Sequence, residues 1–200
     1  MHPCTYTAVM PTESLALFPL HTVLLPGAAL GLRVFEARYL DLIRDCGRNG
    51  RSFGVCLILK GEEVGDPAAA AAFGTEAVIE DFGQGDDGLL TLSVRGKRRF
   101  HVERARVRDN GLQVADVSWC EPDAIESVRP EHGLLPVLLD SIIDKLGGEH
   151  AKAERALMND AAWVAWRLAE LLPLHDSQRQ ELLQMSDPHA RLGRLLQLVS

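Results

Sequence analysis

Residues 17–40, LFPLHTVLLPGAALGLRVFEARYL, contain the pattern that decides the fold. The first apolar run is interrupted by Pro19, which is typical of an edge strand, and Pro26-Gly27 marks a turn. Apolar residues then alternate with small or polar ones over residues 30–34, as in a half-buried strand. At Glu36 the apolar period becomes helical, with Arg38 on the outer face. A strand, a turn and a second strand are therefore predicted to lead directly into a short helix.

The following sequence continues the β-rich pattern to about residue 122. The short helix is expected to end near Gly47. Apolar residues 53–59 predict a central strand, and residues 60–74 predict a long acidic loop. Further strands are predicted over residues 75–82, 89–94, 99–108 and 112–119, the last two joined by an Asn-Gly hairpin turn. Six or seven strands with one short helix indicate a closed or nearly closed β-structure.

From residue 123 to the end, the apolar period is helical. Residues 133–146 predict one helix, Asp160 is suited to N-cap a second, Ser177 a third, and Asp187 before Pro188 a fourth. The fold class predicted is α+β, with a bundle of about four helices after the strands. The domains expected are a flexible leader over 1–14, a β-domain over 15–122 and a helical domain over 123–200.

The composition is that of an ordinary soluble protein, with 46% apolar and 24% charged residues in a chain of 200. The four cysteines lie far apart without a CxxC pair, so idle thiols in a reducing compartment are expected, and no metal site. No signal peptide and no run of about 20 apolar residues is present. A cytoplasmic location without a membrane partner is therefore expected.

Motifs that would indicate catalysis are missing. The sequence has no GxxxxGK[ST] phosphate loop and no GxSxG nucleophile elbow. Its seven histidines are scattered, without an HExxH motif, and are expected at the surface or at helix caps. We therefore expect a binding protein and not an enzyme, with no cofactor and no catalytic residue.

The charges are strongly segregated in a chain of net charge −7. Residues 61–88 carry eight acids and no Lys or Arg, whereas residues 95–108 carry seven bases and one acid. Such asymmetry indicates either a local electrostatic field that attracts a charged partner or two solvated surfaces that face each other. The candidate partner-binding residues of the basic segment are Arg98, Arg104, Arg106 and Arg108.

A second set of candidate partner-binding residues lies at the junction between the second strand and the helix. Glu36, Arg38 and Tyr39 could form the charged lip of a binding groove. The alternative is structural: an ion pair and a packed tyrosine would hold the helix against the strands.

Residues 17–27 and 30–40 resemble the opening of small bacterial Lon N-terminal domain proteins, in which the pattern is close to PLFPL-x-x-VLFPG followed by LPLR-[IV]-FE-x-RY. Residues 61–65, 95–100 and 171–174 match that family in order and spacing. Gly31 departs from it, because the family often has proline there. The resemblance covers roughly residues 15–198.

This resemblance implies a PUA-like β-barrel followed by a helical bundle. In full Lon proteases the region precedes an AAA+ ATPase and a Ser–Lys protease domain, both expected to be absent here, and helps to recognise unfolded substrates. It implies a non-catalytic module, or an adaptor in protein quality control, whose partner is unfolded or extended polypeptide. The apolar cluster of residues 18–25 and the apolar face of the last helix are the expected contact surfaces.

Two alternatives remain open from the sequence. The first is an RNA-binding PUA-like module that uses residues 95–108, although a single aromatic residue, Phe100, and the acidic balance argue against nucleic acid. The second is a pocket for a small ligand.

Overall fold

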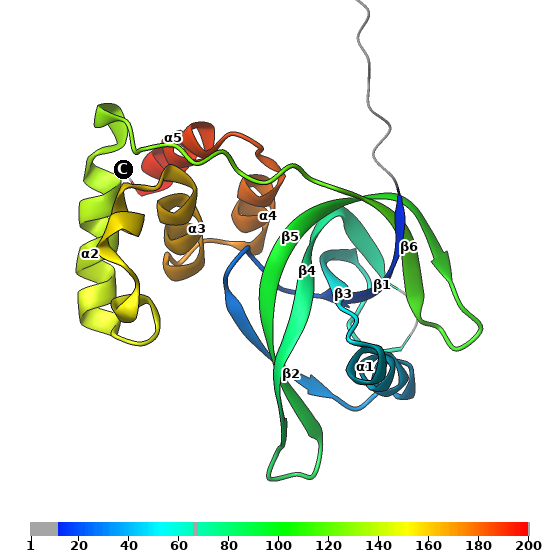
Figure 1. The fold of residues 1–200 in the computed structure, drawn as a ribbon. Coiled ribbons are helices and arrows are strands. Elements are labelled where there is room, and N and C mark those ends of the chain that lie inside the picture. Colours follow the sequence, from blue (N-terminus) through cyan, green and yellow to red (C-terminus); the bar gives the residue numbers. More distant parts are fainter. Residues whose placement is uncertain (1–11, 66–67, 200) are drawn as a thin grey trace, which may run out of the picture.

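The computed structural model describes residues 12–65 and 68–199, which form an α+β fold of six strands and five α-helices. The strands are β1 (Glu13–Leu20), β2 (Ala29–Val34), β3 (Phe53–Lys60), β4 (Ala69–Gln84), β5 (Leu90–Val107) and β6 (Gln113–Trp119). The helices are α1 (Ala37–Asn49), α2 (Leu134–Leu146), α3 (Ala161–Leu171), α4 (Asp176–Gln184) and α5 (Pro188–Val199). Figure 1 shows the strands and α1 in one half of the molecule and the other four helices beside them, which confirms the predicted order.

The six strands form one sheet in the order β2-β5-β4-β3-β1-β6, and β6 also pairs with β5. Five strands are therefore connected in a closed circuit of neighbours, to which β2 is added through β5. All pairs are antiparallel except β1 with β3. The strand at the edge is β2, since β5 is its only partner in the described chain.

The expectation that the first strand lies at an edge is wrong. β1 begins at Glu13, two residues before the expected start, and pairs with β3 on one side and β6 on the other. Pro19 is tolerated because β6 reaches only as far as Ala16, so no second neighbour needs the missing N–H. Residues 1–11 of the expected leader lie outside the described residues.

Two strands are longer than their sequence pattern predicts. The end of the expected acidic loop belongs to β4, which starts at Ala69, and the runs 89–94 and 99–108 are parts of the single strand β5. Register shifts interrupt the β4–β5 pairing at two points. Such irregularities increase local twist and bending, so long strands can curve around a core.

The helix boundaries agree closely with the capping signals. Asp160 accepts a hydrogen bond from the backbone N–H of Trp163 (2.9 Å), and Asp187 caps α5 through the N–H of His189 (2.8 Å). Two boundaries differ: α4 is capped by His175, and α1 continues to Asn49. Gly50, with φ of 60°, ends α1 because the left-handed conformation costs glycine no steric strain.

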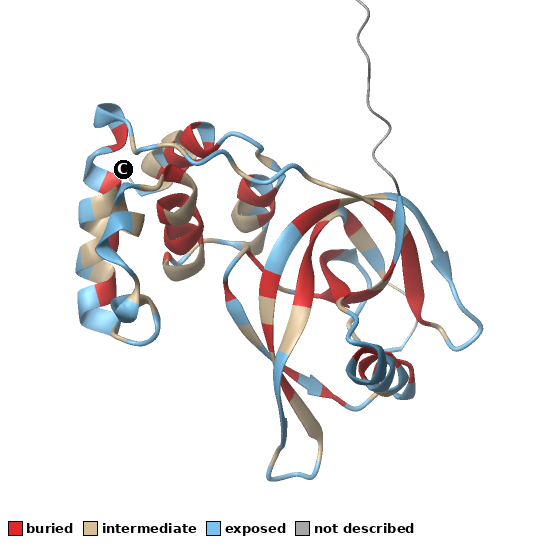
Figure 2. Ribbon diagram, viewed as in Figure 1, coloured by how far each residue is buried: buried red, intermediate tan, exposed pale blue. Residues whose placement is uncertain are grey.

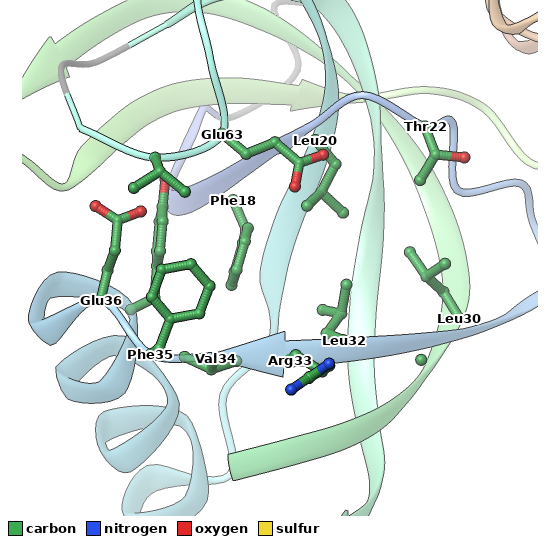
Figure 3. Close-up of a pocket in the computed structure, with 13 residues that line it drawn as sticks. Phe18, Leu20, Thr22, Leu30, Leu32, Arg33, Val34, Phe35, Glu36 and Glu63 are labelled. Carbon is green, nitrogen blue, oxygen red and sulfur yellow. The ribbon is translucent and has the colours of Figure 1, made fainter. Parts of the chain in front are cut away.

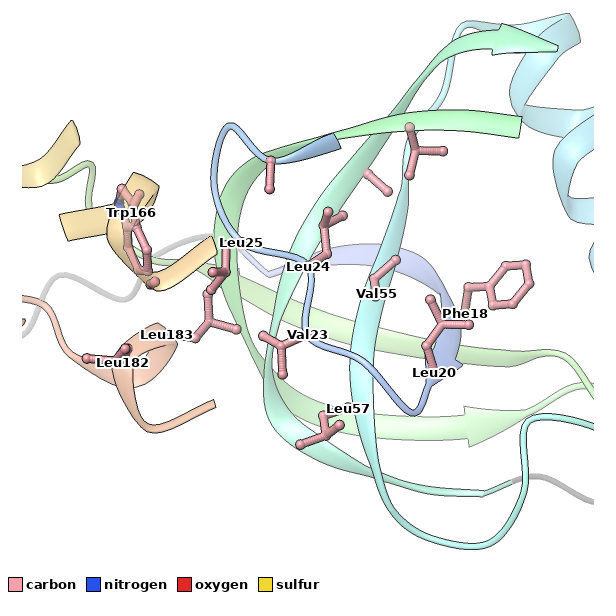
Figure 4. Close-up of a cluster of buried hydrophobic side chains, with 14 of the residues drawn as sticks. Phe18, Leu20, Val23, Leu24, Leu25, Val55, Leu57, Trp166, Leu182 and Leu183 are labelled. Carbon is pink, nitrogen blue, oxygen red and sulfur yellow. The ribbon is translucent and has the colours of Figure 1, made fainter. Parts of the chain in front are cut away.

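A single large hydrophobic core joins the sheet to the helices. The segment of residues 23–25 lies at its centre, with Leu57 of β3 on one side and Trp166 and Leu183 from the helices on the other (Figure 4). Buried residues run through the strands and along α3 (Figure 2), whereas α2 exposes most of its outer face. The core therefore does not stop at the expected domain boundary near residue 122.

A buried polar cluster reinforces the same junction. Arg99 of β5 and Arg191 of α5 both bind the carboxylate of Asp123, at 3.2 and 3.0 Å, and the indole N–H of Trp166 donates to it at 2.6 Å. The guanidinium of Arg191 also stacks on the Trp166 ring at 3.6 Å. We call these four residues the Asp123 cluster. They connect the sheet, the linker and two helices through one carboxylate.

Candidate functional site

A groove of about 350 Å³ lies between β1, β2 and the loop of residues 61–65, and we call it the β1–β2 groove (Figure 3). Its apolar side chains come from both strands, and Leu20 and Leu32 project toward each other across it. The residues that line it are Phe18, Leu20, Thr22, Leu30, Gly31, Leu32, Arg33, Val34, Phe35, Glu36, Tyr39, Glu63 and Val64. The groove is therefore mainly apolar, with charges at its margins.

The floor of the groove is rigid and aromatic. Phe18 stacks on Tyr39 with ring centroids 4.0 Å apart, and Phe53 packs against Phe18 at 5.9 Å. Two large apolar side chains at the rim face solvent: Phe35 is 51% exposed and Val64 is 53% exposed. Exposed apolar side chains beside an apolar groove are typical of a contact surface.

The junction residues form the ion pair of the structural interpretation. Arg38 binds the Glu36 carboxylate at 3.0 Å, donates to the carbonyl of Gly111 at 3.1 Å and lies 4.8 Å over the Tyr39 ring. Arg38 is only 7% exposed, so its expected outward position is wrong. Burial raises the pKa of Tyr39, and Arg38 partly opposes that change.

Glu36 and Tyr39 nevertheless line the groove, whereas Arg38 ties α1 to the β5–β6 hairpin behind it. The binding role predicted for these residues remains a prediction. Their positions specify how each would contact a partner: Glu36 through a carboxylate at the rim of the groove, and Tyr39 through part of its floor.

The basic candidates do not contribute to this groove. Arg98 binds Glu76 at 2.9 Å and stacks on Trp119 at 3.7 Å, and Arg106 binds Asp116 at 2.7 Å. Arg104 and Arg108 are exposed and form no ion pair with the described residues. The groove therefore contains none of the basic candidates, although Arg38 of the junction set reaches Gly111 in the turn that follows Arg108.

The acidic and basic segments face each other across β4 and β5. Arg95 binds Glu80 at 3.0 Å, and Arg98 binds Glu76. Burial acts to raise the pKa of Glu76, but hydrogen bonds from Arg98 and Ser52 outweigh it and lower the pKa. Two of the eight acids and two of the seven bases are therefore paired with each other across β4 and β5.

Other expectations about surfaces need correction. The apolar face of the last helix is inside the bundle, since Leu192 and Leu195 are fully buried. Residues 18–25 are mostly buried too, although Phe18 and Leu20 reach the groove. The sequence interpretation missed Phe35 and Val64, and its one usable signal was that apolar Phe35 follows Val34 and so breaks the alternation.

Two histidines also depart from the expected surface position. His132 and His189 are 9% and 4% exposed, and their rings stack at 5.7 Å. His175, by contrast, is exposed at the N-cap position of α4, where its backbone N–H donates to the side-chain oxygen of Gln178 at 2.8 Å. Among the described residues no group of His, Cys, Asp and Glu side chains could hold a metal ion.

The described cysteines have the environment of structural thiols. Cys46 and Cys56 are buried and free. Burial raises the pKa of Cys46 to about 11 and that of Cys56 to about 12, so both stay protonated at neutral pH. Within the described part of the chain, no helix has the length and apolar character needed to cross a bilayer.

Comparison with known proteins places this geometry in a family. The chain is similar to a solved structure described as the Lon N-terminal domain protein from Xanthomonas campestris, with 59% identity, a TM-score of 0.79, and coverage of 92% of this chain and 98% of that one. It also has the fold of the N-terminal domain of Mycobacterium avium complex Lon protease, with 17% identity, a TM-score of 0.66, and coverage of 92% and 97%. No curated protein matches the chain. Residues 14–200 match the sequence profile of the ATP-dependent protease La (LON) substrate-binding domain, and the chain therefore belongs to that family.

Proposed function

We propose that this protein is a non-catalytic recognition module that binds unfolded or extended polypeptide in the β1–β2 groove. The observation that supports the proposal best is the rim of the groove, where Phe35 and Val64 expose apolar surface above a floor of Phe18 and Tyr39. A folded client buries most of its large apolar side chains, so an unfolded segment offers more of them for contact.

The size of the groove sets the form of recognition. Ligand pockets usually have volumes of roughly 300–1,000 Å³, and a groove of about 350 Å³ is at the lower end. It accommodates the side chains of a short segment and not a folded surface. Affinity for one segment is therefore expected to be modest, and an unfolded chain with several suitable segments binds better than a single peptide.

The membership in a substrate-binding-domain family agrees with this function. The closed circuit of strand pairs supports classification as a PUA-like β-barrel. We further propose an adaptor role in the bacterial cytoplasm, in which the module presents captured chains to a protease.

The test is binding of a fluorescent, reduced and carboxymethylated model protein, measured by anisotropy against the same protein in its folded form. The Phe35→Ala variant should weaken binding of the unfolded form about tenfold, which corresponds to about 1.4 kcal/mol. Phe82→Ala is the matched control, because Phe82 on β4 is 53% exposed and lies outside the groove. Equal binding of folded and unfolded forms, or equal loss in both variants, would overturn the proposal.

RNA binding is a second candidate, supported by Arg104 and Arg108, which are exposed and have no ion-pair partner in the described part of the chain. Phosphate contacts would make affinity fall steeply with salt. We expect the Arg104→Gln/Arg108→Gln double variant to abolish any such binding. Affinity for single-stranded RNA that is undetectable at low ionic strength, or independent of salt, dismisses this candidate.

A further inference from the structure

The backbone of β2 has an unused hydrogen-bonding edge along the β1–β2 groove. β2 pairs with β5 in the register Leu30 with Val94 and Leu32 with Leu92, and Gly96 N–H donates to the Ala28 carbonyl at 2.9 Å. Hydrogen-bonded residues alternate along an antiparallel pair. The peptide groups of Leu30 and Leu32 therefore face β5, whereas those of Gly31 and Arg33 face away from it.

Gly31 is the point at which this edge meets the groove. Gly31 lines the groove, and a Cβ atom at Gly31, which would point out of the sheet and not along its edge, would meet nothing within 4 Å. Across the groove, the part of β1 after Ala16 has no strand partner among residues 12–65 and 68–199 on the side where β6 pairs with its first half. The groove thus lies between two strand segments that each lack a neighbour on one side.

The side chains around this edge indicate what the incoming chain carries. In an added strand, alternate side chains point to one face, so one set would enter the apolar space between Leu20 and Leu32. The rim carries two carboxylates: that of Glu36, which also pairs with Arg38, and that of Glu63, which also accepts the backbone N–H of His21 at 2.6 Å. The basic residue of the lining, Arg33, is paired with Asp87. A carboxylate accepts several hydrogen bonds, so Glu36 and Glu63 still complement a positively charged side chain.

We propose that the occupant of the β1–β2 groove is an extended polypeptide segment that adds to the free edge of β2 as a further strand, with apolar residues at alternate positions and a lysine or arginine beside them. This inference rests on the proposed function and specifies its mode. The N–H and C=O groups of Gly31 and Arg33 pair with the client backbone, and Glu36 and Glu63 attract its basic residue. Backbone pairing supplies affinity independent of sequence, and the groove and its carboxylates supply selectivity.

The first experiment changes the backbone edge of the protein. Gly31→Pro removes the outward-facing N–H and should weaken binding of a fluorescent Lys-Val-Thr-Val-Thr-Val-Lys peptide about tenfold, whereas Gly31→Ala keeps that N–H and should lose clearly less affinity than Gly31→Pro. Proline is tolerated on an edge strand where the N–H faces solvent, and circular dichroism confirms that both variants are folded. Equal affinity of the two variants for the peptide would overturn strand addition.

The second experiment changes the peptide, so that it does not depend on how a variant folds. One peptide is N-methylated at the alternate residues whose N–H groups would face β2, and its affinity should fall about tenfold. A second peptide is N-methylated at the intervening residues, whose N–H groups would face away, and its affinity should stay nearly unchanged. If both methylated peptides bind equally weakly, or both bind as well as the unmethylated peptide, pairing along a single edge is contradicted.

The third experiment tests the charge preference. Replacing both lysines of the peptide by glutamate should abolish binding, and Glu63→Gln should reduce affinity for the lysine peptide several-fold, by removing an attraction in a partly desolvated rim. Asp144→Asn on α2 is the matched control, because it also removes one negative charge but lies outside the groove. Unchanged affinity for the glutamate peptide would overturn the basic preference.

The outcomes separate this inference from the proposed function. In one outcome, unfolded protein binds and Phe35→Ala weakens that binding, but the Gly31→Pro variant binds the peptide normally and the unaltered protein binds both methylated peptides normally. The groove is then a contact site that works by side-chain packing, and strand addition is wrong. If unfolded protein does not bind at all, the proposed function itself fails.

Discussion

Asp123 is a single carboxylate that serves two buried guanidinium groups. Its side chain is 14% exposed, whereas those of Arg99 and Arg191 are 5% and 0% exposed. Burial acts to lower the pKa of Arg191, and the Asp123 carboxylate opposes that change. The backbone carbonyls of Leu183 and Met185 accept further hydrogen bonds from the two arginines. The cluster is therefore satisfied as a whole, and its stability depends on one charge.

The Asp123→Asn variant should be strongly destabilised. Removing one partner of a buried ion pair costs about 3–5 kcal/mol, because the remaining charge stays buried without compensation. For a chain of this size, that loss lowers Tm by roughly 6–20 °C. Urea unfolding and thermal denaturation measure the effect.

Asp116→Asn is the matched control, because Asp116 binds Arg106 at 2.7 Å with both side chains well exposed. An exposed ion pair contributes about 0.2–1 kcal/mol. Similar free energies of unfolding for the two variants would show that the Asp123 cluster does not carry the stability assigned to it.

The residues of the site could be predicted only where the sequence pattern changes. Glu36 and Tyr39 stand at the switch from a period of two to a helical period, and this switch identified them. Phe35 and Val64 lie outside the strands, in the links after β2 and after β3, so no period of apolar residues indicated how exposed they are. Sequence periodicity shows which face of a strand is apolar, but not whether its edge is paired.

Among the strands, β5 is the element on which the sheet and the junction with the helices depend. It pairs with β2, β4 and β6, and its residue Gly96 packs directly against the backbone of Leu25 before the Pro26–Gly27 turn. Gly27 N–H donates to the Gly96 carbonyl at 2.8 Å. A side chain at Gly96 would therefore meet backbone atoms that cannot rotate away.

Gly96→Ala should destabilise the protein by at least 1–3 kcal/mol, the usual cost of overpacking. Gly31→Ala provides the comparison, because the added methyl group there meets nothing within 4 Å. Chemical denaturation of both variants measures the difference. If Gly96→Ala is as stable as Gly31→Ala, the turn moves away from β5 at no cost. The close approach of Gly96 to Leu25 then does not contribute to the stability of the fold.

The lengths of β4 and β5 could not be predicted, for reasons that the structure makes clear. Alanine has a low preference for strands, so residues 69–72 resembled a loop, yet β3 pairs with them at Ala69 and Ala70. The sequence around Gly96 resembled a break between two strands. Pairing with β4 across irregular register keeps β5 continuous there. The helices were easier, because local caps such as Asp160 determine where they begin.

The larger of two hydrophobic cores spans the whole molecule, although the sequence divides into a β-rich and a helical part; the smaller core, around Phe100, lies among the strands. The cluster of buried residues that contains Val55 of β3 also contains Leu168 of α3. The Asp123 cluster joins the same two parts through polar contacts. We therefore expect the sheet and the helices to unfold as a single cooperative unit, in spite of the composition change near residue 122.

Native-state hydrogen exchange of a Leu168→Ala variant tests this cooperativity. Leu168 is fully buried in α3, and its truncation should cost about 2–5 kcal/mol. If the molecule is one unit, the slowest amides of β3 lose as much protection as those of α3, because both exchange through global unfolding. Val55→Ala in β3 is the reciprocal variant and should reduce the protection of α3 to the same extent as that of β3. If the loss of protection is confined to the half that carries the substitution, the sheet and the helices unfold as two separate units. The β1–β2 groove would then be able to open by local unfolding of the strands while the helices stay folded.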